Sequence, residues 1–233
     1  MMGYKVRAII VAAGQGQRMD ADMPKQFLNL KDKPILVHTL EKFDEVEDID
    51  KIVVVTMGEY MDHVKNDILS MYHFKKPIMV IRGGSERQES VYRGIMSLGL
   101  DTDIVVIHDG VRPFVTGDMI QRTIDTAIED EAAVVGVPVK DTIKEVDDDG
   151  YVIDTLYRDI MWNVQTPQTF KYDVIRGAHE FAEKHGIYGT DDAMLVERLD
   201  IPVKMVMGSY KNIKITTKED MVVAEAFLKG DML

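Results

Sequence analysis

The sequence of 233 residues contains no cysteine, and this absence excludes disulfides, thiolate nucleophiles and cysteine-ligated zinc. Cations are scarce relative to anions, since 28 Lys and Arg against 40 Asp and Glu give a formal net charge of −12. A nucleic-acid-binding or anionic-membrane surface needs a broad basic field, so neither partner is expected. An anionic ligand must therefore meet a local basic pocket.

Long hydrophobic runs are also missing. No segment approaches the roughly 20 apolar residues of a membrane span, and the apolar run after Arg7 lacks the length and cleavage signal of a secretory peptide. Hydrophobic residues at 45% and charged residues at 29% are typical of a soluble protein. We therefore expect a cytoplasmic protein with no membrane partner.

Short apolar runs rich in β-branched residues alternate along the chain with segments of helical period. This alternation predicts a doubly wound α/β fold with a mostly parallel sheet, of the Rossmann-like kind. The expected strands cover residues 7–11, 51–56, 78–81, 104–107 and 133–137. The expected helices cover residues 34–43, 60–72, 86–98, 119–131, 172–185 and 191–199. A last helix should begin near Thr217, because Thr216 and Glu219 have the spacing of a capping box.

A β-hairpin arm is expected at about residues 139–159. Two strand-like runs, 142–146 and 151–156, flank the acidic turn Asp147-Asp148-Asp149-Gly150. Two strands are too few to be stable alone in water, so the arm should pack on another surface, and a second subunit is one candidate. No repeat, linker or low-complexity segment marks a further domain, and we expect a single domain over residues 1–233.

The most informative motif follows the first expected strand. Ala12-Ala13-Gly14-Gln15-Gly16-Gln17-Arg18-Met19 leaves the carboxyl end of that strand, and Pro24-Lys25-Gln26 comes shortly after it. Small residues let backbone N–H groups approach an anion, and ligands of open α/β sheets bind at this edge. A plain tight turn is an alternative, whereas the spacings of a dinucleotide loop and of a P-loop are both absent. The motif predicts a triphosphate loop of another kind, with Arg18 and Lys25 as its cations.

Two further loops follow expected strands at the same edge. Gly83-Gly84-Ser85-Glu86-Arg87, with Ser90 one turn along, permits close backbone approach to a base or sugar, although a simple strand-to-helix turn fits equally well. In His108-Asp109-Gly110-Val111-Arg112-Pro113, Asp109 suits Mg²⁺ or a ribose hydroxyl, and a turn residue is the alternative. Arg112 suits an anion or the organisation of the loop, and His108 is interpreted as structural.

Candidates for a second ligand lie later in the chain. They are Asp141-Thr142 on the arm, Arg158 at its end and Gln165-Thr166-Pro167-Gln168, which is also compatible with a turn. Thr190 and Asp191 both suit the N-cap of the following helix. Lys214 is expected on a short strand among apolar neighbours, where a lysine usually faces solvent.

Taken in this order, the motifs resemble those of the 2-C-methyl-D-erythritol 4-phosphate cytidylyltransferase family of non-mevalonate isoprenoid synthesis. The resemblance covers nearly the whole chain, and the ordered series is far more specific than any one motif. Besides the first loop and Pro24-Lys25-Gln26, it rests on Gly83-Gly84, Glu86-Arg87, Ser90-Val91, His108-Asp109, Arg112-Pro113, Val137-Pro138-Val139, Asp141-Thr142-Ile143-Lys144, Gln165-Thr166-Pro167-Gln168, Thr190-Asp191-Asp192-Ala193 and Asn212-Ile213-Lys214.

The resemblance implies transfer of a cytidylyl group from CTP to methylerythritol phosphate, with Mg²⁺ and with release of pyrophosphate. It implies catalytic roles for Arg18 and Lys25 at the triphosphate and for Arg158 and Lys214 at the sugar phosphate. It also implies a homodimer in which Arg158 and Thr142 reach the neighbouring subunit's site. The nucleotide would be bound by Ala12, Ala13, Gly14, Gly16, Gly83, Gly84, Ser85, Arg87, Ser90, Asp109 and Gly110, with Asp109 as metal ligand. The acceptor would be bound by Asp109, Arg112, Thr142, Arg158, Thr166, Thr190 and Lys214.

Two alternatives remain open at this point. The family usually has alanine where Gly110 stands, and residues 108–114 also resemble the ribitol-5-phosphate cytidylyltransferases, which differ in the acceptor. Residues 137–144 and 189–193 are closer to the methylerythritol phosphate family. A non-catalytic nucleotide-binding protein on the same fold is the second alternative, and it is disfavoured because all four catalytic candidates are present.

Overall fold

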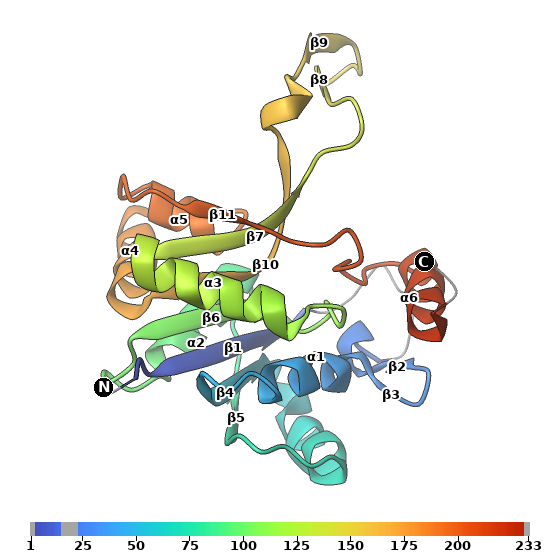
Figure 1. Cartoon of the computed structure of the whole chain (residues 1–233), viewed down its shortest axis with the longest axis vertical. Helices are drawn as coiled ribbons and strands as arrows, with labels where there is room; N and C mark the ends of the chain where they lie inside the picture. Colours follow the sequence, from blue (N-terminus) through green and yellow to red (C-terminus); the bar gives the residue numbers. More distant parts are fainter. Residues whose placement is uncertain (1–2, 15–22, 231–233) are drawn as a thin grey trace.

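A seven-stranded sheet forms the centre of the protein, in the order β11-β7-β10-β6-β1-β4-β5 (Figure 1). The structure, a computed structural model, describes residues 3–14 and 23–230. Every strand of this sheet runs in the same direction except β10, which pairs antiparallel with both of its neighbours. The predicted doubly wound, mostly parallel α/β fold is confirmed.

The five strands expected from the sequence are all present, each with ends within two residues of the prediction. They are β1 (Val6–Ala12), β4 (Ile49–Thr56), β5 (Ile78–Arg82), β6 (Ile104–Asp109) and β7 (Ala132–Pro138). The apolar runs of β1, β4, β6 and β7 are mostly buried on both faces of the sheet, as parallel strands covered by helices require, whereas only Val80 is buried in the edge strand β5. Four strands were not expected from the sequence: β10, β11 (Lys204–Met207), and the two strands of a separate ribbon, β2 (Asn29–Leu30) and β3 (Lys33–Pro34).

The strand β10 (Trp162–Lys171) contains the Gln-Thr-Pro-Gln motif, so the alternative of a turn at this motif is wrong. Gln165, Thr166 and Gln168 are buried there between β6 and β7, and the Thr166–Pro167 peptide bond is cis. Pairing with β7 is irregular between Val164 and Gln168, which is the kind of position that tolerates proline in a sheet. This strand was not predicted because it contains polar residues and a proline, whereas strands are usually recognised by apolar periodicity.

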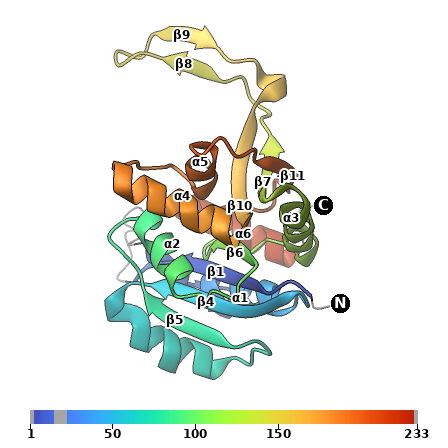
Figure 2. The ribbon, with the colours of Figure 1, turned by 90° about the vertical axis from the view of Figure 1, so that its left-hand side faces the viewer.

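Helices cover both faces of the sheet (Figures 1 and 2). On one face α1 (Ile35–Asp44) and α3 (Gly117–Asp130) share an apolar cluster with Ala8 and Ile10 of β1. On the other face α2 (Arg87–Met96), α4 (Tyr172–His185) and α5 (Asp192–Glu197) share a cluster with Ile9. The last helix, α6 (Lys218–Lys229), packs near β2 and β3 in a smaller cluster. None of the helices in the described parts of the chain is long and apolar enough to span a membrane.

One helix is less regular than predicted, and one capping prediction was wrong. The helix expected over residues 60–72 is present as a continuous helical segment over residues 58–71. Its geometry changes from the 3-10 turn η3 (Gly58–Tyr60) to the π-helical η4 (His63–Ile68) and the 3-10 turn η5 (Leu69–Met71), and within these three elements only Val64 and Ile68 are buried. The capping box of α6 pairs Thr217 with Asp220, one residue later than predicted. The Asp220 carboxylate fixes the start of α6 at this position, because it accepts hydrogen bonds from the Thr216 and Thr217 N–H groups and from the Thr216 hydroxyl.

The predicted hairpin arm is confirmed, and it projects away from the sheet (Figures 1 and 2). It consists of β8 (Lys144–Val146) paired antiparallel with β9 (Val152–Thr155), followed by the 3-10 turn η6 (Arg158–Ile160). Every residue of β8 and β9 is exposed, and the apolar side chains of Ile153 and Ile160 are 61% and 69% exposed. The arm therefore presents apolar surface to its surroundings.

The strand order reverses between β1 and β6. From β1 the chain adds β4 and β5 on one side, and it then crosses to β6 on the other side of β1. Ligands of open α/β sheets bind at the carboxyl ends of the strands beside such a reversal. Because β1, β5 and β6 run in the same direction, the loops that follow all three lie at that edge.

Candidate active site

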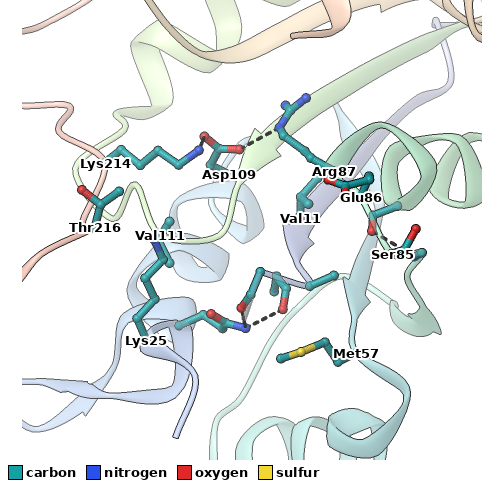
Figure 3. Close-up of a pocket in the computed structure, with 16 residues that line it drawn as sticks. Val11, Lys25, Met57, Ser85, Glu86, Arg87, Asp109, Val111, Lys214 and Thr216 are labelled. Carbon is teal, nitrogen blue, oxygen red and sulfur yellow. Dashed lines mark hydrogen bonds and ion pairs between the residues drawn. The ribbon is translucent and has the colours of Figure 1, made fainter. Parts of the chain in front are cut away.

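A pocket of about 700 Å³ lies where β1 and β6 end (Figure 3). It brings together loops that are far apart in the sequence, and in Figure 3 Lys25 and Lys214 lie on one side while Ser85 and Arg87 lie on the other. Ten of the predicted site residues line it, namely Ala12, Ala13, Gly14, Lys25, Gly84, Ser85, Arg87, Ser90, Asp109 and Lys214. Gly16 and Arg18 lie outside the described residues.

The other two glycines of the predicted nucleotide site do not line this pocket. Gly83 lies in a smaller adjoining pocket, which also contacts Gly84 and Ser85. Gly110 is buried behind the site, where its N–H donates to the carbonyl oxygen of Val11 at 2.8 Å. A Cβ atom at Gly110 would lie only 3.1 Å from that oxygen and from Leu36 Cδ1, so glycine fits this position with less crowding than alanine.

Asp109 is the electrostatic centre of the site. Lys214 Nζ lies 2.9 Å from its Oδ2, Arg87 Nε lies 3.3 Å from its Oδ1, and Arg112 Nε lies 3.5 Å from Oδ2. Figure 3 shows Lys214 and Arg87 approaching the carboxylate from opposite sides. Burial alone would raise the pKa of Asp109, but the three cations outweigh burial and hold that pKa well below its usual range. Asp109 is therefore an anion at every physiological pH.

Arg87 bridges two buried carboxylates. Besides Asp109, it contacts Asp192 at the start of α5, with Nη1 2.9 Å from Oδ2, and His179 Nε2 lies 3.3 Å from the other oxygen of Asp192. Burial on its own lowers the pKa of Arg87, but Asp192 and Asp109 raise it by a larger amount. The guanidinium therefore remains charged, and its position is fixed from two elements.

His108 and Thr166 support Asp109 from behind. The backbone N–H of Asp109 donates to Thr166 Oγ1 at 3.1 Å, and this hydroxyl lies 3.0 Å from His108 Nδ1. His108 Nε2 lies 3.2 Å from the carbonyl oxygen of Arg112, which can only accept, so Nε2 carries the proton and Nδ1 accepts from Thr166. Burial lowers the pKa of His108 to about 3. The interpretation of His108 as structural is confirmed, and Thr166 lies behind the pocket.

The segment that carries Lys214 is not a strand, so that prediction was wrong. It is fixed to the loop after β6 instead, because the Ile215 N–H donates to the Val111 carbonyl at 2.9 Å and Arg112 Nη1 donates to the Asn212 carbonyl at 2.8 Å. Asn212 is buried, and its Nδ2 donates to the Thr166 carbonyl at 2.9 Å. Arg112 therefore organises the loop, which is one of its two predicted roles.

Five of the seven predicted acceptor residues do not line the pocket of their own chain. Arg112 and Thr166 lie behind it, and the other three are exposed. Thr142 is exposed on the arm, and Arg158 at the end of the arm is exposed and donates to the Lys140 carbonyl at 3.1 Å. Thr190 is exposed and precedes Asp191, whose carboxylate accepts from the Met194 N–H and is the N-cap of α5. The expectation that the arm serves a neighbouring subunit's site stays a prediction.

Gln26 has a structural role that the Pro24-Lys25-Gln26 motif did not indicate. Gln26 is buried, and its Nε2 donates to the carbonyl oxygens of Ala12 at 2.7 Å and of Gly14 at 3.1 Å. These two bonds fix the start of the first loop. The pocket wall also includes Val11, Met57, Glu86, Val111 and Thr216, whose residue types carry no signal of their own.

The cation cluster generates a prediction about stability. Asp109→Asn removes the negative charge and leaves Arg87, Arg112 and Lys214 around a neutral side chain, so we expect the free energy of unfolding to fall by about 3 kcal/mol. The measurement is urea unfolding in metal-free buffer. Asp101→Asn is the matched control, because Asp101 also pairs with two cations but at the surface, where ion pairs contribute little. Equal losses in the two variants would contradict a central role for Asp109.

The same comparison has a defined pH dependence. The pKa of Asp109 in the folded protein lies below its ordinary value of 3.8, so its stabilisation is complete above that value and is lost as pH falls through the folded pKa. The difference in stability between wild type and Asp109→Asn should be constant between about pH 5 and 8 and should shrink below about pH 4. A difference that grows on acidification would contradict the depressed pKa.

Known proteins resemble this chain over almost its whole length. Residues 6–230 match the family of 2-C-methyl-D-erythritol 4-phosphate cytidylyltransferase. Relatives with that name include a protein of Caldanaerobacter subterraneus, 48% identical over 96% of this chain and 99% of its own, and one of Clostridioides difficile, 51% identical over 94% and 92%.

The fold comparison agrees with the sequence comparison. The crystal structure of 4-diphosphocytidyl-2C-methyl-D-erythritol synthase from Anaerococcus prevotii has a TM-score of 0.87, with 36% identity and 97% of each chain covered. Matches of this extent in both sequence and fold include the arm and the Lys214 segment as well as the central sheet. The chain belongs to the 2-C-methyl-D-erythritol 4-phosphate cytidylyltransferase family and is a cytidylyltransferase.

Proposed function

We propose that this chain transfers the cytidylyl group of CTP to the phosphate of 2-C-methyl-D-erythritol 4-phosphate, as a step of isoprenoid precursor biosynthesis. The products are 4-diphosphocytidyl-2-C-methyl-D-erythritol and pyrophosphate. The observation that carries the proposal is the pocket at the strand-order reversal, which combines the backbone of the first loop with Lys25 and Lys214 on one side. Such a pocket suits two polyanions that must be brought together in a protein of net charge −12.

The first loop is proposed to hold the triphosphate. Among the described residues, no atom lies within 4 Å of a Cβ placed on Gly14, so a phosphate could approach the backbone there. Lys25, together with Arg18, would stabilise the charge that grows on the departing pyrophosphate. Gln26 keeps the carbonyl oxygens of Ala12 and Gly14 turned toward its own amide at 2.7 and 3.1 Å. This arrangement favours contact of an anion with N–H groups.

The attacking group needs positioning more than activation. A phosphate monoester has a second pKa of about 6, so it is largely a dianion near neutral pH and requires no strong general base. Lys214 would hold this phosphate in line with the α-phosphorus of CTP, and Arg158 would do so from the neighbouring subunit's arm. The ion pair of Lys214 with Asp109 at 2.9 Å places the ammonium group before any substrate binds.

Mg²⁺ is proposed to bind together with the CTP phosphates. Mg²⁺ usually takes one or two carboxylates and fills its other positions with phosphate oxygens and water. Asp109 is the proposed carboxylate ligand because it is ionised and lines the pocket. Its two oxygens already pair with Arg87, Arg112 and Lys214, so the ion would compete with these cations for Asp109. No group of three potential metal-binding side chains occurs in residues 3–14 and 23–230. The ion would neutralise part of the triphosphate charge, and its other ligands would come from CTP.

A homodimer is proposed to form through the arm. The exposed apolar side chains of the arm need a partner surface, and a second copy would bring Thr142 and Arg158 toward the acceptor half of the other site. We also propose a single domain over residues 1–233, which the continuous sheet from β1 to β11 supports. A cytoplasmic location stays a proposal.

The acceptor can be tested directly. Purified protein should release pyrophosphate from CTP with methylerythritol phosphate and much less with ribitol 5-phosphate, because residues 6–230 match the family that is named for the first acceptor. The measurement is a pyrophosphate-release assay with the two acceptors at equal concentration. The opposite ranking would assign the chain to the ribitol phosphate reaction.

The two lysines have separable roles. Lys25→Ala and Lys214→Ala should each lower kcat by about 100-fold or more, because each removes a cation from the transition state. Lys214→Ala should still bind CTP, which calorimetry can measure. Lys171→Ala is the control, because Lys171 resembles Lys214 in exposure and ion pairing but lies outside the pocket. The Lys171 side chain is 37% exposed and pairs with Glu131 at 3.1 Å, and the Lys214 side chain is 38% exposed and pairs with Asp109 at 2.9 Å. Unchanged turnover in both site variants would defeat these roles.

The dimer prediction concerns the arm. Ile153→Asp and Ile160→Asp place charge on its exposed apolar side chains, so both should shift the protein toward monomer and reduce turnover while CTP binding persists. Sedimentation velocity measures the assembly. Leu100→Asp, at an 80% exposed apolar residue away from the arm, should change neither property. A wild-type monomer with full activity would refute the shared site.

A further inference from the structure

Side chains of α2 hold three consecutive residues of the loop between β5 and α2. Arg93 Nη1 donates to the carbonyl oxygen of Gly83 at 2.7 Å, the Gly84 N–H donates to Ser90 Oγ at 3.0 Å, and the Ser85 N–H donates to Glu89 Oε2 at 2.7 Å. Each contact fixes the direction of one backbone dipole. The loop is therefore organised by the helix that follows it.

Glu89 and Arg93 act as one unit in this arrangement. Arg93 Nη2 lies 2.5 Å from Glu89 Oε1, and the Ser85 hydroxyl donates to Glu89 Oε2 at 2.9 Å. The hydrogen bonds from the Ser85 N–H and hydroxyl, followed by Arg93, lower the pKa of Glu89, so this carboxylate stays charged. The guanidinium thus joins the Gly83 carbonyl to the carboxylate that holds Ser85.

The pair lies on the far side of the loop from the nucleotide pocket. Glu89 and Arg93 line the adjoining pocket of about 420 Å³, and neither lines the larger one. Gly84 and Ser85 line both pockets, so the loop is the wall between them. Any effect of the pair on a bound nucleotide must therefore pass through the loop.

The loop has little freedom to move on its other side. A Cβ atom at Gly83 would lie 2.8 Å from Ala13 Cβ and 2.8 Å from Ser90 Oγ, so Gly83 is in close contact with the first loop and with α2. The Gly83 N–H also donates to the Thr56 carbonyl at 2.7 Å. The wall is consequently fixed from β4, from the first loop and from α2.

We propose that Glu89 and Arg93 are positioning residues that set the base selectivity of the nucleotide site. The inference rests on the proposed function, in which this loop meets the cytosine of CTP. Cytosine and uracil have nearly the same shape and differ in which edge atoms donate and accept. A site separates such bases only if its own donors and acceptors keep fixed directions, and preorganised groups also lose less entropy on binding.

The experiment compares CTP with UTP in the full-length protein. Arg93→Ala and Glu89→Ala should each lower the ratio of kcat/KM for CTP over UTP by about three- to tenfold, mainly through a higher KM for CTP. The KM for the sugar phosphate should not change. Arg93→Lys keeps the positive charge but cannot contact the Gly83 carbonyl and Glu89 with two separate nitrogens. It should therefore give a CTP to UTP ratio between those of the wild type and Arg93→Ala.

A matched pair on another helix is the control. Arg176 and Glu180 of α4 have the same spacing, with Nε 2.8 Å from Oε1, and belong to neither pocket. Arg176→Ala and Glu180→Ala should leave the CTP to UTP ratio unchanged. Melting temperatures of all variants separate a change in the loop from a general loss of stability.

Two results would overturn the proposal. One is an unchanged CTP to UTP ratio in both α2 variants, with or without a fall in melting temperature. The other is a wild-type protein that does not distinguish the two nucleotides. If the wild type shows no turnover, the proposed function fails separately, and calorimetric affinities for CTP and UTP in the same variants still decide the role of the pair.

Discussion

The buried carboxylate of Asp109 and the cations around it connect parts of the chain that are far apart in the sequence. Arg87 comes from α2, Arg112 from the loop after β6, and Lys214 from a segment about 100 residues further on. Asp192 extends the same network through Arg87 to α5. A buried anion with three cations is stable only while all partners are in place, so the network fixes the relative positions of these elements.

This network also keeps cationic groups at the pocket of a strongly acidic protein. An unpaired ammonium or guanidinium group in a partly buried pocket would lose hydration without gaining a partner. The ion pairs with Asp109 compensate for this loss of hydration. The network keeps a net positive charge, because the three cations Arg87, Arg112 and Lys214 outnumber the two carboxylates of Asp109 and Asp192. The site is therefore ready for a triphosphate without a broad basic surface, which agrees with the net charge of −12.

The sequence predicted the parts of the fold that follow from apolar periodicity, and ten of the site residues. The runs around Ile9, Val53 and Val106 could only be buried strands, and loops after such strands share one edge. The central strand β10 was missed because Gln165, Thr166 and Gln168 are buried polar residues whose partners lie elsewhere in the chain. Gln26 was missed for the same reason, since its role depends on the carbonyl groups it meets after folding.

The position of β10 links the two halves of the proposed site. Its start leads out of the arm at η6, and its centre carries Thr166, which accepts from the Asp109 N–H. Arg158 therefore lies just before β10, whereas Asp109 ends the neighbouring strand β6 and contacts the centre of β10 through Thr166. In the proposed dimer the two residues serve different pockets. β10 therefore connects the arm to the strand that carries Asp109, because it pairs with β6 at Gln168 and Ile107.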